Sequence, residues 1–151
     1  MDTKDLLVLD GGMGRELARR GAPFRQPEWS ALALMEAPET VREVHQAYAA
    51  SGARVITTNS YALVPFHIGA ERFAAEGERL AALAGQLARE VADDQGGAVQ
   101  VAGSLPPLFG SYRADLYQAE RVSELATPLV RALSPHVDLW LAETMSLIAE
   151  P

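Results

Sequence analysis

Short apolar runs that end in polar or glycine residues recur four times along the chain. They are Leu6–Leu9 before Asp10-Gly11-Gly12, Val55–Thr58 before Asn59-Ser60, Val99–Ala102 before Gly103-Ser104, and Leu139–Ala142 before Glu143-Thr144. Continuous apolar character is typical of buried parallel strands, and the carboxyl ends of such strands lie at one rim of the sheet. We therefore expect four parallel strands whose polar ends meet at a single edge.

Segments with apolar residues at helical spacing lie between these runs. We predict helices over residues 13–22, 37–51, 71–93 and 120–133. In the second helix Pro38 stands in the first turn and Gly52 follows the end, where these residues favour helix boundaries. Pro128 should kink the fourth helix or restart it with Thr127 as a new N-cap. Residues 145–151 resemble a helix that has only begun.

Alternating strands and helices predict an α/β protein built from βα units. A complete (β/α)8 TIM barrel uses about 250 residues, so four units in 151 residues predict the first half of such a barrel. We expect residues 1–151 to form one domain, the amino-terminal half, with the second half absent. An open sheet of this kind leaves apolar surface uncovered unless another segment or chain packs on it.

Composition narrows the function classes. Thirteen Lys and Arg against twenty Asp and Glu give a net charge of −7, which disfavours binding to nucleic acid or to anionic membranes. The apolar runs are far shorter than the roughly 20 residues of a membrane span, and we expect a cytoplasmic protein. The chain has no cysteine, so it offers no thiolate ligand. His45, His67 and His136 are too scattered to predict a metal cluster.

Five motifs in order resemble the homocysteine S-methyltransferase family. They are Leu9–Gly14 with Glu16-Leu17, Trp29–Leu34, Thr57–Tyr61, Gly103–Pro107 and Ala142–Met145. The resemblance covers the family's amino-terminal half, and Arg15 stands where a threonine is common. It implies a (β/α)8 fold and methyl transfer to the homocysteine thiol to form methionine. It also implies zinc held by cysteines of the second half, and a donor such as S-methylmethionine or S-adenosylmethionine.

Asp10-Gly11-Gly12 is the first candidate binding segment. Glycines directly after a strand allow a sharp turn and a close approach of the backbone to a ligand, and Asp10 can accept hydrogen bonds from an ammonium group. By resemblance, that ligand is the amino-acid end of homocysteine. The alternative is a tight turn in which Asp10 caps the following helix. The third glycine of a dinucleotide-binding fingerprint is missing.

Glu143, followed by Thr144, is the second candidate. A carboxylate at the end of a buried strand is costly unless it is paired, and the resemblance implies contact with the substrate amine. The alternative is an ion pair with an arginine such as Arg54 or Arg113. Asn59-Ser60 is expected either to donate to the substrate carboxylate or to cap the next helix, and Trp29 and Tyr61 are candidate pocket-lining aromatics. Gly103–Pro107 is expected to be mainly scaffold.

Two functions from different classes remain open. In the first, the chain is the substrate-binding part of a methyltransferase, either truncated or one subunit of a split barrel completed by a carboxy-terminal half. In that case we expect neither zinc binding nor turnover by the isolated chain. In the second, it is a non-catalytic half barrel that self-associates, for example as a homodimer, and binds an amino acid or nothing.

Overall fold

The computed structural model describes residues 6–149. The helices are α1 (Met13–Arg19), α2 (Ser30–Glu36), α3 (Pro38–Ala50), α4 (Pro65–Ile68), α5 (Ala70–Asp94) and α6 (Val122–Leu133), the strands are β1 (Val55–Thr57), β2 (Gln100–Leu105) and β3 (Leu139–Ala142), and the 3-10 turns are η2 (Ala114–Leu116), η3 (Ala119–Arg121) and η4 (Ser134–His136). None of the described helices is both long enough and apolar enough to cross a membrane.

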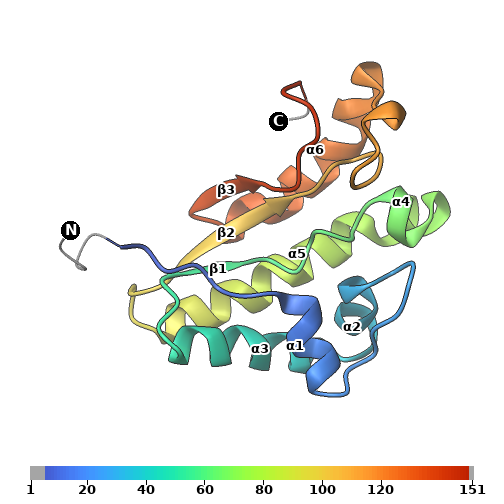
Figure 1. The fold of residues 1–151 in the computed structure, drawn as a ribbon. Coiled ribbons are helices and arrows are strands. Elements are labelled where there is room, and N and C mark those ends of the chain that lie inside the picture. Colours follow the sequence, from blue (N-terminus) through green and yellow to red (C-terminus); the bar gives the residue numbers. More distant parts are fainter. Residues whose placement is uncertain (1–5, 150–151) are drawn as a thin grey trace.

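The strands form one parallel sheet in the order β1-β2-β3. Ile56 pairs with Val101, and Gly103 pairs with Trp140. Helix α5 connects β1 to β2, and α6 connects β2 to β3, as parallel strands require. The α/β class with a parallel sheet is therefore confirmed, and Figure 1 shows β1, β2 and β3 side by side with α5 and α6 running along them.

The predicted first strand differs from the structure. Leu6–Leu9 runs beside β1 (Figure 1), but its only ladder contact is an isolated bridge from Leu9 to Val55. Two short backbone bonds support this bridge, from Arg54 N to Val8 O at 2.7 Å and from Asp10 N to Val55 O at 2.9 Å. The four apolar side chains are 53–58% exposed. No strand among residues 6–149 pairs with the far edge of this segment, so the described sheet has three strands and not four.

The four predicted helices are confirmed as α1, α3, α5 and α6, with boundaries within about three residues. Helix α6 continues through Pro128, so no new helix starts at Thr127. Helix α2 was not predicted, because its seven residues are almost uniformly apolar and show no amphipathic period. Residues 145–149 form bends and turns instead of a helix, and residues 150–151 lie outside the described part.

The hydrophobic core lies between the sheet and the helices. Ile56 and Val101 point from the sheet into a cluster with Ala88 and Val91 of α5. Because side chains alternate along a strand, Thr57, next to Ile56, points to the opposite face. That face, at the carboxyl ends of the strands, is where the polar residues gather.

Candidate functional site

A pocket of about 420 Å³ opens at the carboxyl ends of β1 and β3. It collects five of the seven residues predicted from the sequence to bind substrate, namely Asp10, Gly11, Gly12, Asn59 and Glu143. The other lining residues are Leu9, Met13, Gly14, Ser30, Thr57, Thr58, Tyr61 and Leu141. Segments that are far apart in sequence thus meet at one rim, as parallel strands predict.

Asp10 links the amino-terminal segment to β1. Its Oδ2 accepts a hydrogen bond from the Thr57 backbone N–H at 2.8 Å, and its Oδ1 accepts one from Thr57 Oγ1 at 3.0 Å. Burial raises the pKa of Asp10, the two bonds from Thr57 oppose this, and the nearby charge of Glu143 adds to the rise. Asp10 makes no bond that caps α1, whose N-cap is Gly12. The capping alternative is therefore not the observed arrangement.

Gly11 and Gly12 form the turn after Asp10, and Tyr48 of α3 supports it. The Tyr48 hydroxyl donates to the Gly12 carbonyl at 3.2 Å. A Cβ built on Gly11 would lie 2.8 Å from the Tyr48 ring, so only glycine fits without displacing that ring. The sequence pattern does not reveal this contact between Tyr48 and the turn, because helical spacing carries no information about a loop contact.

Glu143 follows β3 and points toward the same pocket. Its carboxylate Oε1 accepts a hydrogen bond from Ser104 Oγ. Among residues 6–149 no ion pair joins Glu143 or Asp10 to a basic side chain, and Arg113 pairs instead with Asp115. The alternative of an ion pair between Glu143 and an arginine is therefore not observed in the described structure.

Asn59, Ser60 and Thr144 have separate surroundings. Asn59 lines the pocket, and its Nδ2 donates to the Ser30 carbonyl at 3.0 Å, which ties β1 to the start of α2. Ser60 is fully buried and does not line this pocket, and its hydroxyl donates to the Ser104 carbonyl. Thr144 has a φ of 61° and does not line the pocket. Neither Asn59 nor Ser60 caps α4, which begins after Val64.

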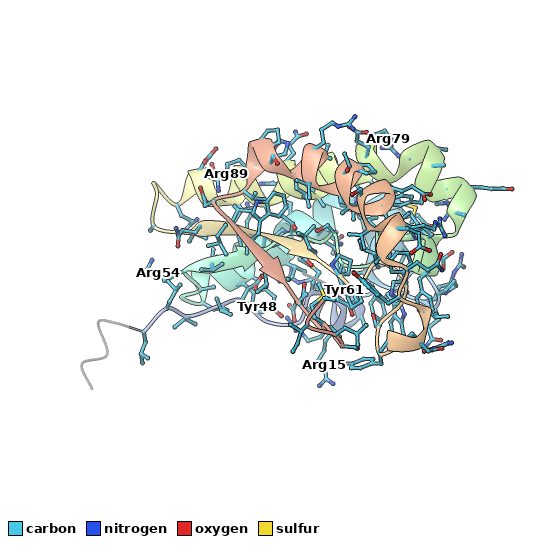
Figure 2. All side chains as sticks on the ribbon, turned by 90° about the horizontal axis from the view of Figure 1, so that it is seen from above. Arg15, Tyr48, Arg54, Tyr61, Arg79 and Arg89 are labelled. Atoms are coloured by element: carbon cyan, nitrogen blue, oxygen red, sulfur yellow. The ribbon has the colours of Figure 1, made fainter. Side chains whose placement is uncertain are left out.

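A second pocket, of about 530 Å³, adjoins the first and is rich in aromatic side chains. The two pockets share Gly14, Ser30 and Tyr61. The aromatic residues of the second pocket are Phe24, Trp29, Tyr61, Phe66 and Tyr112. Figure 2 shows Tyr61 within the body of the molecule, whereas the exposed Arg15 side chain points away from it. The site therefore combines a polar rim with an aromatic neighbour.

The described residues do not fit a zinc site of the kind that the resemblance implies. The chain contains no cysteine, and within residues 6–149 no three His, Asp or Glu side chains come together as metal ligands. His45 is fully buried on α3, and His67 is buried with its Nδ1 3.2 Å from the Pro27 carbonyl. Within residues 6–149, neither histidine belongs to a cluster of metal ligands.

Comparison with known proteins decides the family. The model of the homocysteine S-methyltransferase family matches residues 7–151. The homocysteine S-methyltransferase of Escherichia coli is 38% identical over 76% of this chain, and that of Bacillus subtilis is 31% identical over 99%. The chain belongs to the homocysteine S-methyltransferase family. The recognition from five ordered motifs is thereby confirmed.

The solved structures of this family agree with the fold. The metallated form of the Escherichia coli homocysteine methyltransferase MmuM superposes with a TM-score of 0.82 at 34% identity, over 99% of this chain and 57% of that one. The chain spans about half the length of the curated relatives it matches, 39% of the Escherichia coli protein and 53% of the Bacillus subtilis protein.

Proposed function

We propose that this chain provides the amino-acid-binding part of an enzyme that transfers a methyl group to the thiol of homocysteine and forms methionine. The observation that carries the proposal is the pair of carboxylates, Asp10 and Glu143, in one pocket with no basic partner among residues 6–149. Partly buried carboxylates without a counter-charge are costly, and a substrate ammonium group would relieve that cost. Family membership supports homocysteine as the substrate.

The pocket residues then have distinct roles. Glu143 accepts hydrogen bonds from the ammonium group, because within residues 6–149 only its Oε1 has a hydrogen-bond partner. Asp10 adds negative charge, although both of its oxygens already accept bonds from Thr57. Gly11 and Gly12 are exposed and carry no side chain, so the amino-acid end of the substrate can approach the turn closely.

The aromatic pocket supports a cationic methyl donor. S-methylmethionine and S-adenosylmethionine carry a positively charged sulfonium group, which is attracted to aromatic faces. Trp29 and Tyr61 lie beside the proposed homocysteine site, with Tyr61 lining both pockets. A donor held there would present its methyl group toward the thiol.

We propose that residues outside this chain activate the thiol. A free thiol with a pKa of about 8.5 is mostly protonated at neutral pH, and only the thiolate attacks carbon readily. We propose that residues 1–151 are the amino-terminal half of a (β/α)8 domain, and that any zinc ligands come from a complementing carboxy-terminal half. Two observations support a partner at the edges of the sheet. The Leu6–Leu9 segment is exposed, and Trp140 of the edge strand β3 is 41% exposed.

Reconstitution tests the proposal. The chain is produced together with the carboxy-terminal part of the Escherichia coli relative that it does not match, and methionine formed from homocysteine and S-methylmethionine is measured by mass spectrometry. We expect turnover from the combination, no turnover from either part alone, and no stoichiometric zinc in the purified chain by elemental analysis. Glu143→Ala should raise the KM for homocysteine more than 10-fold, since stranding a charge partner costs about 2–5 kcal/mol.

The matched control is Glu120→Ala, which removes an exposed glutamate remote from the pocket residues in sequence and should leave KM unchanged. A combination that assembles but never methylates homocysteine would contradict the proposed activity. A stable homodimer that binds amino acids without methyl transfer would favour the alternative, a non-catalytic half barrel.

A further inference from the structure

Three buried hydroxyl-bearing residues lie beneath Glu143 at the carboxyl ends of β1 and β2. Thr58 is 3% exposed, and Ser60 and Ser104 are fully buried. Thr58 and Ser60 follow β1, whereas Ser104 belongs to β2 and Glu143 follows β3. This hydroxyl cluster, Thr58, Ser60 and Ser104, therefore connects all three strands.

The donors and acceptors in the hydroxyl cluster can be assigned from valence alone. The Ser104 N–H donates to Thr58 Oγ1 at 3.0 Å, and Ser60 Oγ donates its only proton to the Ser104 carbonyl at 2.9 Å. Thr58 Oγ1 and Ser60 Oγ are 2.8 Å apart. Since the Ser60 proton is already used, the Thr58 hydroxyl must donate to Ser60. The three bonds form a closed ring in which both the N–H and the carbonyl of Ser104 have a hydrogen-bond partner.

The ring does not use the proton of the Ser104 hydroxyl, which is therefore available for a hydrogen bond to another residue. Its Oγ donates to Oε1 of Glu143, and a carboxylate can only accept. Hydrogen bonds to charged groups are stronger than those between neutral groups, and a buried donor on a rigid strand holds the acceptor in one orientation. Without this bond the partly buried Glu143 side chain could adopt several rotamers in the pocket.

We propose that Ser104 is a positioning residue, which holds the Glu143 carboxylate in the orientation that receives the amino group of homocysteine. The inference rests on the proposed function, because it assigns a support to the residue that binds the ammonium group. The motif Gly103–Pro107 predicts mainly a scaffold, whereas in the structure the Ser104 side chain has a defined partner in Glu143. Its effect on binding should therefore pass through Glu143.

Two ligands separate amine recognition from the rest of the site. L-homocysteine and 4-mercaptobutanoate share the thiol and the carboxylate, but only homocysteine has the amino group. Titrations of the 151-residue chain, followed by NMR in the presence of a phosphine reductant, give the two dissociation constants. Ser104→Ala should weaken homocysteine binding about 10-fold, as expected for a lost bond to a charged group, and leave 4-mercaptobutanoate unchanged.

A double-mutant cycle tests whether Ser104 acts through Glu143. In the Glu143→Gln background, adding Ser104→Ala should change homocysteine binding less than twofold, because the shared interaction is already altered. Ser104→Cys replaces the hydroxyl with a somewhat larger thiol that is only a weak donor, so it should resemble the alanine variant in binding and serves if that variant does not fold. Ser123→Ala, an exposed serine on α6, is the matched control and should leave both ligands unaffected.

The outcomes distinguish a failure of the proposed amine site from a failure of the role proposed for Ser104. A parent chain that binds homocysteine no better than 4-mercaptobutanoate overturns the proposed amine site and this inference with it. If the parent prefers homocysteine, the inference alone is overturned when the Ser104 variants bind homocysteine normally, weaken both ligands equally, or add their full effect in the Glu143→Gln background. Selective, non-additive loss of homocysteine binding supports it.

Discussion

The buried histidine of α3 predicts a specific dependence of stability on pH. His45 is fully buried, and neither ring nitrogen has a hydrogen-bond partner among the described residues. Burial lowers the pKa of His45 from 6.5 to about 4. The unfolded chain therefore takes up a proton at this position as the pH falls below about 6.5, whereas the folded protein does not until about pH 4.

The sign and size of the effect follow from this difference. The contribution of neutral His45 to stability is fully present above pH 6.5 and is lost as the pH falls toward 4. A drop in pKa from 6.5 to about 4, at about 1.4 kcal/mol per pH unit, corresponds to about 3 kcal/mol over the whole window. Between pH 6 and 5.3 the free energy of unfolding should therefore change by about 1 kcal/mol through His45 alone.

The variant His45→Leu isolates the contribution of His45 to the pH dependence of stability, because the other titrating groups contribute equally to both proteins. Urea unfolding followed by tryptophan fluorescence gives the free energy of unfolding from pH 7.5 to 5.3, above the isoelectric point of about 4.9 where solubility is lowest. At pH 7.5 the variant should be close to the parent in stability, since an apolar side chain of similar volume removes the unpaired ring nitrogens. Its advantage should grow as the pH falls.

Two results would refute this reasoning. The first is an equal pH dependence for parent and variant, which would mean that the folded and unfolded states bind the proton equally well. The second is an NMR titration in which the His45 ring protonates near pH 6.5 in the folded protein.

Two further predictions concern stability at opposite ends of the strands. Asp138 accepts bonds from Arg89 and, at 2.7 Å, from the Val101 N–H. Burial opposes these bonds, but together they hold the Asp138 pKa below its ordinary value. Asp138→Asn should thus cost about 1 kcal/mol at pH 7 in urea unfolding and less below pH 4; a pH-independent cost would contradict this. In Gly11→Ala the new Cβ would lie 2.8 Å from the Tyr48 ring, which should lower the free energy of unfolding by about 1–3 kcal/mol. Adding Tyr48→Leu should restore most of that loss. Unchanged stability of the Gly11→Ala variant would refute the clash.

Most of the helices and strands were predictable, because local patterns determine them. The run Leu139–Ala142 matches β3 residue for residue, and the periodic leucines of α5 mark a helix that spans Ala70–Asp94. Leu6–Leu9 has the same apolar character as β3 but forms only an isolated bridge with Val55. Whether such a run becomes a strand depends on neighbours along both edges, and a local pattern does not contain that information.

The sequence was sufficient to predict which residues lie together at the rim of the pocket. Parallel strands bring their carboxyl ends to one edge, so Asp10, Asn59 and Glu143 had to lie near one another once the strands were located. Which atoms they contact was not predictable in the same way. Asp10 bonds to Thr57 instead of capping α1, because the amino-terminal segment is held beside β1 by long-range backbone bonds.

The position of Ser104 shows most clearly why register limits prediction from sequence. Ser104 pairs with Leu141 across β2 and β3, and this alignment puts its hydroxyl within reach of Glu143, two residues beyond Leu141. A slip of one residue would turn the Ser104 side chain to the opposite face of the sheet, toward the helices. The motif Gly103–Pro107 reveals that a serine stands near the rim, but only the pairing of three strands decides that it faces the carboxylate. Glu143 can be named as a site residue from the sequence. The contact by which Ser104 positions it depends on strand register and is therefore visible only in the structure.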